Sequence, residues 1–315
     1  MATTRRATEA ERLTRWTTRI AGGQRIYEQW AETYEVARLQ QYYLGHQWRG
    51  LAETDAQQRY AINYVFPTIE TQIPSLLFHR PQIKVSARPA HADDQQSQSA
   101  SRAQLIESTL QTVIDNPTLQ FKAQTQLCLR DAFFRFGVIE VGYSADWAEN
   151  PHAGKPVLRE NDEVMTDGGG QPVTQPDQVL QGESVYLKRI PPQYFRVSTS
   201  SRNLLADNDW IAYCEWHYVE DLKRSTVYRK TSTLKASGAL TDERPIDADD
   251  THADMVKVWK VWDLRTRERH VIAEGHDHFL LEGTAWTTLP FAALKFYEIP
   301  DAWYPLPPVF NWLSP

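Results

Sequence analysis

The chain of 315 residues has only two cysteines, Cys128 and Cys214, which lie far apart in the sequence. Two cysteines are too few for a disulfide framework or a cysteine-rich zinc site, so we expect buried free thiols. Long apolar runs are also missing, because none approaches the ~18 to 20 residues that a membrane-spanning helix needs. With 23% charged residues and a mean hydropathy of −0.55, the composition excludes an integral membrane protein. The first residues lack the apolar stretch of a secretory signal, which favours synthesis in the cytosol.

The chain also lacks an excess of positive charge. Its formal net charge is −6 and its sequence pI is about 5.9. This balance argues against a protein whose main function is to grip phosphates. It remains compatible with a surface past which DNA slides without sticking.

Catalytic signatures are missing as well. The sequence has no Gly-x-Ser-x-Gly elbow, and residues 167–170 (Asp-Gly-Gly-Gly) are not followed by the Lys and Ser or Thr of a nucleotide-binding loop. The acidic run from Asp242 to Asp254 lacks the ligand order of a calcium loop and indicates a solvated loop. We therefore expect no catalytic residue and no cofactor.

Three histidines form the best candidate for a metal site. If the segment is a strand, His276 and His278 share one face and could hold a divalent ion, with His270 upstream. Gly275 instead favours a hairpin turn with exposed polar side chains. We expect no metal ligands here, but a metal-dependent hydrolase using these histidines and a nearby carboxylate stays open as the alternative function.

What the chain does have is apolar and aromatic residues. It is 41% hydrophobic, with 11 Trp, 14 Tyr and 11 Phe, enough for one large or two modest domains. Trp259 and Trp262 are three residues apart in a predicted strand, so they face opposite sides of it. We interpret most aromatics as core residues rather than as a platform for bases or sugars.

The front half has the spacing of helices. Residues 8–44 carry apolar side chains at helical intervals, and Gly22 and Gly23 are expected to divide them into two helices. A further helix is predicted over residues 66–78, with Asn63 as its cap. Residues 83–87 alternate and predict a strand.

Further helices and strands follow. Leu105, Ile106, Leu110, Val113 and Ile114 share one face of a helix over residues 102–115. The next helix is predicted to begin at Asn116 and Pro117 and to end at Gly137. Predicted strands cover residues 138–143, 185–187, 194–197, 210–218, 256–262, 270–272, 279–281 and 291–296, with a short helix over residues 219–228.

These patterns predict an α+β fold, with N-terminal helices packed on a mostly antiparallel, strand-rich C-terminal half. The segments are an N-terminal helical hairpin (1–50), a helical core with strands (51–144), a long flexible loop or surface hairpin (145–182), strands plus a short helix (183–228), an acidic linker (229–254) and a strand-rich segment (255–315).

Several segments resemble tailed-bacteriophage portal proteins, most closely those of short-tailed phages. The first is Tyr-Tyr-Leu-Gly-His-Gln-Trp at residues 42–48, followed by Asn63 before a helix and by Arg80 and Pro81 opening the predicted strand. Two later segments fit the same pattern, at residues 191–213 and 258–263. Together they span roughly residues 35 to 310, and none of them is a catalytic signature.

The resemblance implies a structural protein without enzymatic activity, located in the virion and made in the cytoplasm of a bacterial host. Portal subunits form a ring, typically of twelve copies, at one capsid vertex, where it is the conduit for packaging and ejecting DNA. The implied partners are further copies of the chain, the terminase, capsid proteins, tail or adaptor proteins and transiently passing double-stranded DNA, but no membrane. Portal proteins usually continue into a stem of long helices. We therefore expect this chain to correspond to their wing-like part, and either to be truncated before a stem or to have the remaining parts on another chain.

Overall fold

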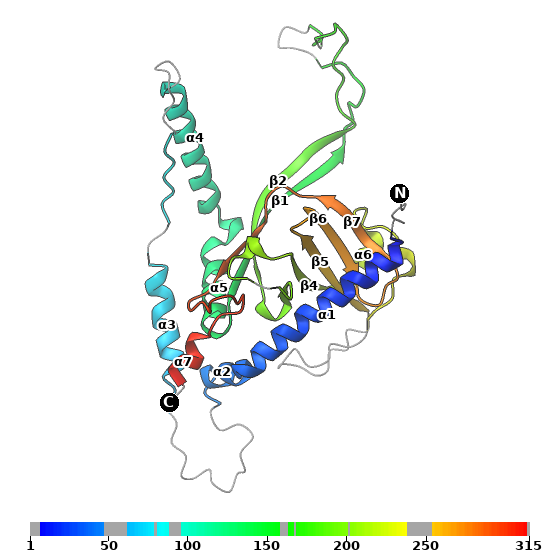
Figure 1. Cartoon of the computed structure of the whole chain (residues 1–315). Coiled ribbons are helices and arrows are strands. Elements are labelled where there is room, and N and C mark those ends of the chain that lie inside the picture. Colours follow the sequence, from blue (N-terminus) through cyan, green and yellow to red (C-terminus); the bar gives the residue numbers. More distant parts are fainter. Residues whose placement is uncertain are drawn as a thin grey trace, which may run out of the picture. The chain divides into compact units, whose positions relative to one another are not determined.

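The computed structural model describes residues 7–46, 62–78, 81–87, 96–157, 163–166, 168–200, 202–237 and 254–313. The predicted α+β class is confirmed: helices dominate the first half of the sequence, and antiparallel strands dominate the second half (Figure 1). The chain forms two compact units. Unit 1 comprises residues 1–80, 122–140 and 189–315, and unit 2 comprises residues 81–121 and 141–188.

Unit 1 is built on a five-stranded antiparallel sheet, in the order β3-β4-β5-β6-β7. Side chains on the two faces of the sheet belong to two separate apolar clusters. Trp259 packs with Trp16 on one side, and Trp262 packs with Tyr213 on the other, so their predicted opposite orientation is confirmed. The strands are β3 (Phe195–Val197), β4 (Trp210–Tyr218), β5 (Met255–Asp263), β6 (Glu268–Ala273) and β7 (Phe279–Ala285).

Helix α1 (Glu9–Thr33) packs on this sheet without interruption, so the predicted break at Gly22 and Gly23 is wrong. The glycines allow close packing. A Cβ atom on Gly23 would lie 2.8 Å from both the Trp210 ring and the Val197 carbonyl oxygen. The chain turns later, at Glu35, which has a left-handed backbone (φ 46°) and precedes α2 (Val36–Tyr43). The predicted N-terminal hairpin is therefore one long helix followed by a short one.

Three further helices pack against α2 in a third apolar cluster. They are α3 (Val65–Leu76), α5 (Phe121–Phe134) and α7 (Pro308–Leu313), and the cluster includes Leu39, Ile69 and Phe133. The N-cap residue of α3 is Tyr64 and not the predicted Asn63, although the Asn63 Oδ1 atom accepts the Phe66 N–H at 3.2 Å. Helix α5 ends three residues before Gly137, which begins the next strand rather than ending the helix.

The C-terminal segment packs beside the N-terminal helix. The Trp30 indole N–H donates to the Pro305 carbonyl at 2.8 Å, and Trp30 stacks on Tyr304 with ring centroids 5.3 Å apart. Trp303 lies in the same cluster and is 1% exposed. The beginning and the end of the described chain therefore complete one core.

The predicted acidic linker at residues 229–254 is wrong in its first part. After α6 (Val219–Arg224), a 3-10 turn, η6 (Thr231–Thr233), brings Leu234 into a fourth apolar cluster, where it is 3% exposed. Ser237 donates its backbone N–H to Met255 at 3.1 Å. Most of the acidic run, residues 242–250, lies outside the described residues.

In unit 2, helix α4 (Gln96–Asp115) lies against the segment that was predicted to be a strand. Residues 81–87 carry no strand, and that prediction is wrong. Two of their backbone N–H groups donate to α4 side chains instead: Ile83 to Gln111 at 3.2 Å and Val85 to Glu107 at 3.0 Å. The alternation of apolar and polar residues predicted one buried and one exposed face. In the structure, side chains of α4 accept the backbone N–H groups of this segment in place of a neighbouring strand.

Two long strands, β1 (Gly137–Glu149) and β2 (Gln178–Ile190), form a hairpin whose outer part belongs to unit 2. The prediction of a long flexible loop at residues 145–182 is wrong at both ends, because residues 145–149 belong to β1 and residues 178–182 belong to β2. An isolated bridge between Pro156 and Thr174 continues the pairing beyond the strands. At the unit 1 end, β1 pairs with β8 (Phe291–Leu294). The remaining 3-10 turns are η3 (Pro117–Leu119), η4 (Pro192–Tyr194) and η5 (Leu205–Asp207).

Candidate functional site

Each of the three histidines proposed as metal ligands is held by other protein groups and not at a shared ion site, and His276 and His278 both contact Lys230. His276 and His278 lie in the turn after Gly275 (φ 73°), with ring centroids 5.7 Å apart. The His276 Nε2 atom lies 3.1 Å from the Lys230 carbonyl oxygen. The His278 Nδ1 atom lies 3.2 Å from Glu9 Oε1. The predicted turn is confirmed, and each imidazole already has a hydrogen-bonding partner.

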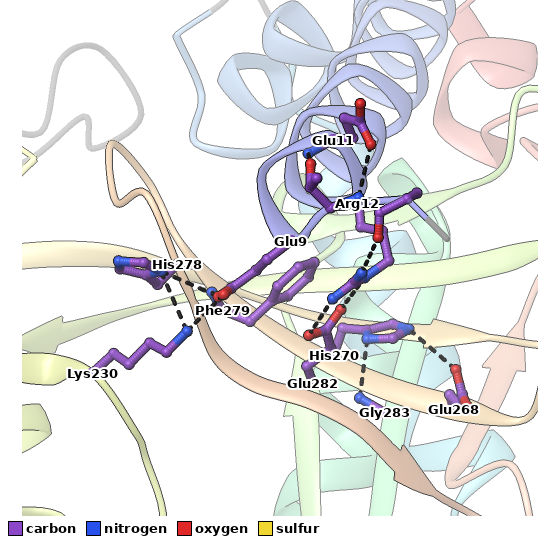
Figure 2. Close-up of polar contacts among 12 residues, drawn as sticks. Glu9, Glu11, Arg12, Lys230, Glu268, His270, His278, Phe279, Glu282 and Gly283 are labelled. Atoms are coloured by element: carbon purple, nitrogen blue, oxygen red, sulfur yellow. Dashed lines mark hydrogen bonds and ion pairs between the residues drawn. The ribbon is translucent and has the colours of Figure 1, made fainter. Parts of the chain in front are cut away.

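Glu9, in the first turn of α1, is the centre of this polar group (Figure 2). Its Oε2 atom accepts from the Lys230 ammonium at 2.6 Å, and its Oε1 atom also accepts the Phe279 backbone N–H at 3.4 Å. The hydrogen bond from Lys230 lowers the pKa of the Glu9 carboxyl to about 2, with a smaller contribution from His278. Glu9 is therefore ionised at neutral pH and joins α1 to the start of β7.

A second ion pair, between Arg12 and Glu282, holds the next turn of α1 against β7. The Arg12 guanidinium donates from Nε and Nη2 to the two carboxylate oxygens of Glu282, at 2.6 and 3.0 Å. This bidentate geometry, and above all its hydrogen bonds, raises the pKa of Arg12. Like Glu9, Arg12 joins α1 to β7.

His270 belongs to a different environment, inside the sheet. Its ring lies 5.3 Å from that of Trp16 and 5.7 Å from that of Phe279, and its Nδ1 atom accepts the Gly283 N–H at 3.2 Å. Burial lowers the pKa of His270, because the charged imidazolium is poorly solvated there. Figure 2 shows His270 in contact with Gly283 and Glu268, and His278 in contact with Glu9 and Lys230. The polar group does not unite the three candidate ligands.

Over the described residues, no group of three or more His, Cys, Asp or Glu side chains has the arrangement needed to hold a metal ion. The two cysteines are buried and form no disulfide, as expected. Burial raises the pKa of the Cys128 thiol to about 12, so it is not a reactive thiolate at neutral pH. The chemistry available in this part of unit 1 is that of structural ion pairs.

Unit 2 presents a different kind of candidate site, made of exposed apolar side chains. On α4, Leu105, Ile106 and Leu110 are 66%, 49% and 42% exposed. The sequence pattern predicted their shared face. The opposite side of α4, with Glu107 and Gln111, is the side bonded to residues 81–87. We call residues 105, 106, 109, 110 and 113 the α4 stripe.

One face of the β1–β2 hairpin carries most of its exposed apolar side chains. A Cβ atom on Gly142 would lie 2.2 Å from the Tyr186 ring, so even-numbered residues of both strands share one side. On the other side the Tyr143 hydroxyl donates to Glu183 at 2.5 Å. This odd-numbered side carries most of the exposed apolar residues, whereas Leu180 and Tyr186 are exposed on the even-numbered side. We call the odd-numbered side the ribbon face. Its apolar members are Val141, Tyr143, Ala145, Trp147, Val179 and Val185.

Sequence reasoning did not identify the ribbon face as a candidate surface. Trp147, which is 59% exposed, fell in the segment assigned to a loop, although Tyr143, Ala145 and Trp147 alternate with Ser144 and Asp146. That period-two pattern continues the strand predicted up to residue 143, and it could have revealed the face.

Comparisons with known proteins leave the family open: no model of a protein family matches the chain, and no curated protein sequence matches it. Within the ranges that the structure describes, no helix combines the length and apolar content needed to cross a membrane.

Proposed function

We propose that this chain is a structural subunit of a phage portal, the ring at one capsid vertex through which DNA is packaged and ejected. The proposal starts from the sequence resemblance at residues 42–48, 191–213 and 258–263. In this role the chain would have no enzymatic activity. It would position neighbouring copies, the terminase, and capsid and tail proteins around the DNA.

The observation that most supports an assembling subunit is the exposed apolar surface of unit 2. Trp147 and Tyr143 expose more than half of their side chains, as does Leu105 on α4. Large apolar patches that face solvent in a single chain are typical of surfaces that another protein covers. A two-stranded ribbon is also marginal by itself and gains stability from packing against another element.

The charge and the polar contacts fit the same role. A net charge of −6 disfavours tight binding to phosphates, and a conduit needs DNA to remain mobile. The most distinctive polar group, around Glu9 and Arg12, ties α1 to β7 through ion pairs. These contacts hold the start of α1 against β7, which suits a subunit whose role is to position other proteins.

The test is the mass of the particle formed in solution. Mass photometry and size-exclusion chromatography are run on this chain and on the protein as its natural gene encodes it, over a wide concentration range. We expect a closed assembly of many copies, typically twelve, from the natural protein. A natural protein that stays monomeric at high concentration would contradict the proposal.

Function is tested separately by terminase binding. The purified assembly is immobilised and exposed to the large and small terminase subunits of a short-tailed phage, with an unrelated ring protein of similar charge as control. Binding to the assembly but not to the control ring is expected. Stoichiometric zinc or manganese that is lost in a His276→Ala variant would favour the hydrolase instead.

A further inference from the structure

The α4 stripe and the ribbon face are two separate apolar surfaces of unit 2, and both face solvent. The stripe residues are three and four positions apart, so they form one line along the helix. The ribbon-face residues are two positions apart along each strand, so they form one side of a two-stranded sheet. Each surface has the form that commonly packs against the other, a helix on a sheet.

We infer that the α4 stripe of one copy docks on the ribbon face of the next copy. This inference rests on the proposed assembly and specifies its contact. Because the two surfaces differ, the contact is heterologous, and repetition of such a contact generates a ring when the rotation closes.

The dimensions of the two surfaces agree. From residue 102 to residue 113 the helix is about 17 Å long, at ~1.5 Å per residue. From Val141 to Trp147 the strand is about 20 Å long, at ~3.4 Å per residue. Arg102 and the stripe of one copy together therefore cover most of the length of the ribbon face.

The area is sufficient for a specific contact. Since aromatic side chains bury ~150 to 250 Å² each, the apolar parts of the two surfaces together expose on the order of 800 Å². Polar neighbours add to this, and a specific interface needs about 1,000 Å² in total. Tyr143 and Trp147 supply the large, rigid anchors that dominate such contacts.

The charges on the two surfaces favour α4 of a neighbouring copy, and not a second ribbon, as the partner of the ribbon face. The ribbon face carries Glu183, whose carboxylate accepts from the Tyr143 hydroxyl. Two ribbon faces packed together would enclose two like charges, which is unfavourable in a dry contact. The α4 stripe has no acid, and Arg102 lies on the same side of the helix, one turn before Leu105. A neighbouring α4 therefore brings a cation to the face that carries the carboxylate.

Disulfide trapping tests the pairing directly in the full-length protein. Thr109→Cys places a thiol within the α4 stripe, and Ala145→Cys places one on the ribbon face, without removing the large apolar residues. The native Cys128 and Cys214 are buried, so the wild-type protein is expected to give no cross-link and serves as the background control. Under mild oxidation, a mixture of the two single variants is expected to give covalent dimers, and the double variant a ladder of larger species.

Each outcome bears on a separate statement. Cross-linking of Ala145→Cys with itself would show that two ribbons pair, and it would overturn the inference while leaving the assembly intact. An assembly of normal mass that gives no cross-link in the mixture would overturn it as well. If the wild-type protein forms no assembly at all, the proposed function fails first.

Two sets of variants add a quantitative test. Leu105→Ser with Ile106→Ser is expected to raise the assembly midpoint concentration roughly 100-fold, because two buried aliphatic side chains are lost. Leu204→Ser, at a 63% exposed residue of unit 1, is the matched control and leaves the midpoint unchanged. An equal effect of the control would contradict the inference.

The charge pair covers the case in which the double serine variant does not fold. Arg102→Glu is expected to raise the midpoint about 2- to 5-fold, the range of an exposed ion pair. Adding Glu183→Arg is expected to restore it. A double variant that assembles worse than either single variant would oppose the pairing of these two surfaces.

Discussion

Gly23 gives the sharpest test of how α1 packs on the sheet. Helix propensity alone predicts that Gly23→Ala stabilises the chain by about 1 kcal/mol. The structure predicts the opposite sign. The added Cβ atom would lie 2.8 Å from the Val197 carbonyl oxygen, a backbone atom of β3, and 2.8 Å from the Trp210 ring. Neither group can rotate away as a flexible side chain would.

The magnitude follows from the balance of these two effects. An extra carbon in a tightly packed core costs about 1 to 3 kcal/mol, and sometimes more. After the gain in propensity of about 1 kcal/mol, we expect Gly23→Ala to lower the free energy of unfolding by up to about 2 kcal/mol. With a urea dependence of roughly 2 to 3 kcal/mol per molar, the midpoint of unfolding falls by about 0.5 M.

The assay is urea unfolding followed by tryptophan fluorescence, since Trp210 and Trp16 lie in the affected cluster. Gly22→Ala is the matched control one residue earlier. Its added Cβ would lie 3.1 Å from the Thr199 Cγ2 atom, a side-chain methyl that can move, so the change is expected to be neutral or stabilising. If Gly23→Ala stabilises the protein as much as Gly22→Ala, the close packing of α1 on β3 and β4 is refuted.

Two further predictions concern pH. The folded state lowers the pKa of Glu9 from 4.5 to about 2, so the stabilisation by this contact is present above pH 4.5 and is lost as the pH falls towards 2. Hydrogen exchange at the start of α1 checks this: Glu9→Gln should exchange faster than wild type at pH 6, and a difference that persists undiminished at pH 2 would contradict it. Burial lowers the pKa of His270 from 6.5, so below that pH the unfolded chain takes up a proton that the folded chain does not, and stability falls. In His270→Gln this part of the pH dependence should disappear from the unfolding midpoints between pH 7 and 5; an unchanged slope would assign it to other groups.

The helices and strands were predictable where the reason for them is local. Strand β4 occupies residues 210–218 as predicted, because every second residue faces the same cluster. The break at Gly22 and Gly23 was wrong because the reason for these glycines is not local. They make room for Val197, Thr199 and Trp210, which lie far along the chain, and no window of neighbouring residues contains that information.

The same distinction applies to the candidate sites. Gly275 predicted the turn that holds His276 and His278. It could not predict that His278 contacts Glu9, 269 residues away, because pattern reasoning does not pair distant charges. For α4, the pattern gave the apolar stripe, but periodicity states which side chains share a face and not what covers it. The sequence pattern therefore placed Leu105 on an apolar face of the helix, and only the structure shows that this face is exposed.

The hydrogen bond between Trp30 and Pro305 has a consequence for biosynthesis. A ribosome adds about 5 to 20 residues per second, so the helix that carries Trp30 waits roughly 15 to 60 s for its partner to emerge. Strands β3 and β4 can cover part of α1 earlier, but the part that packs against Tyr304 and β7 stays uncovered because these are synthesised late. Nascent chains of this protein should consequently depend on a holding chaperone until translation has passed residue 305.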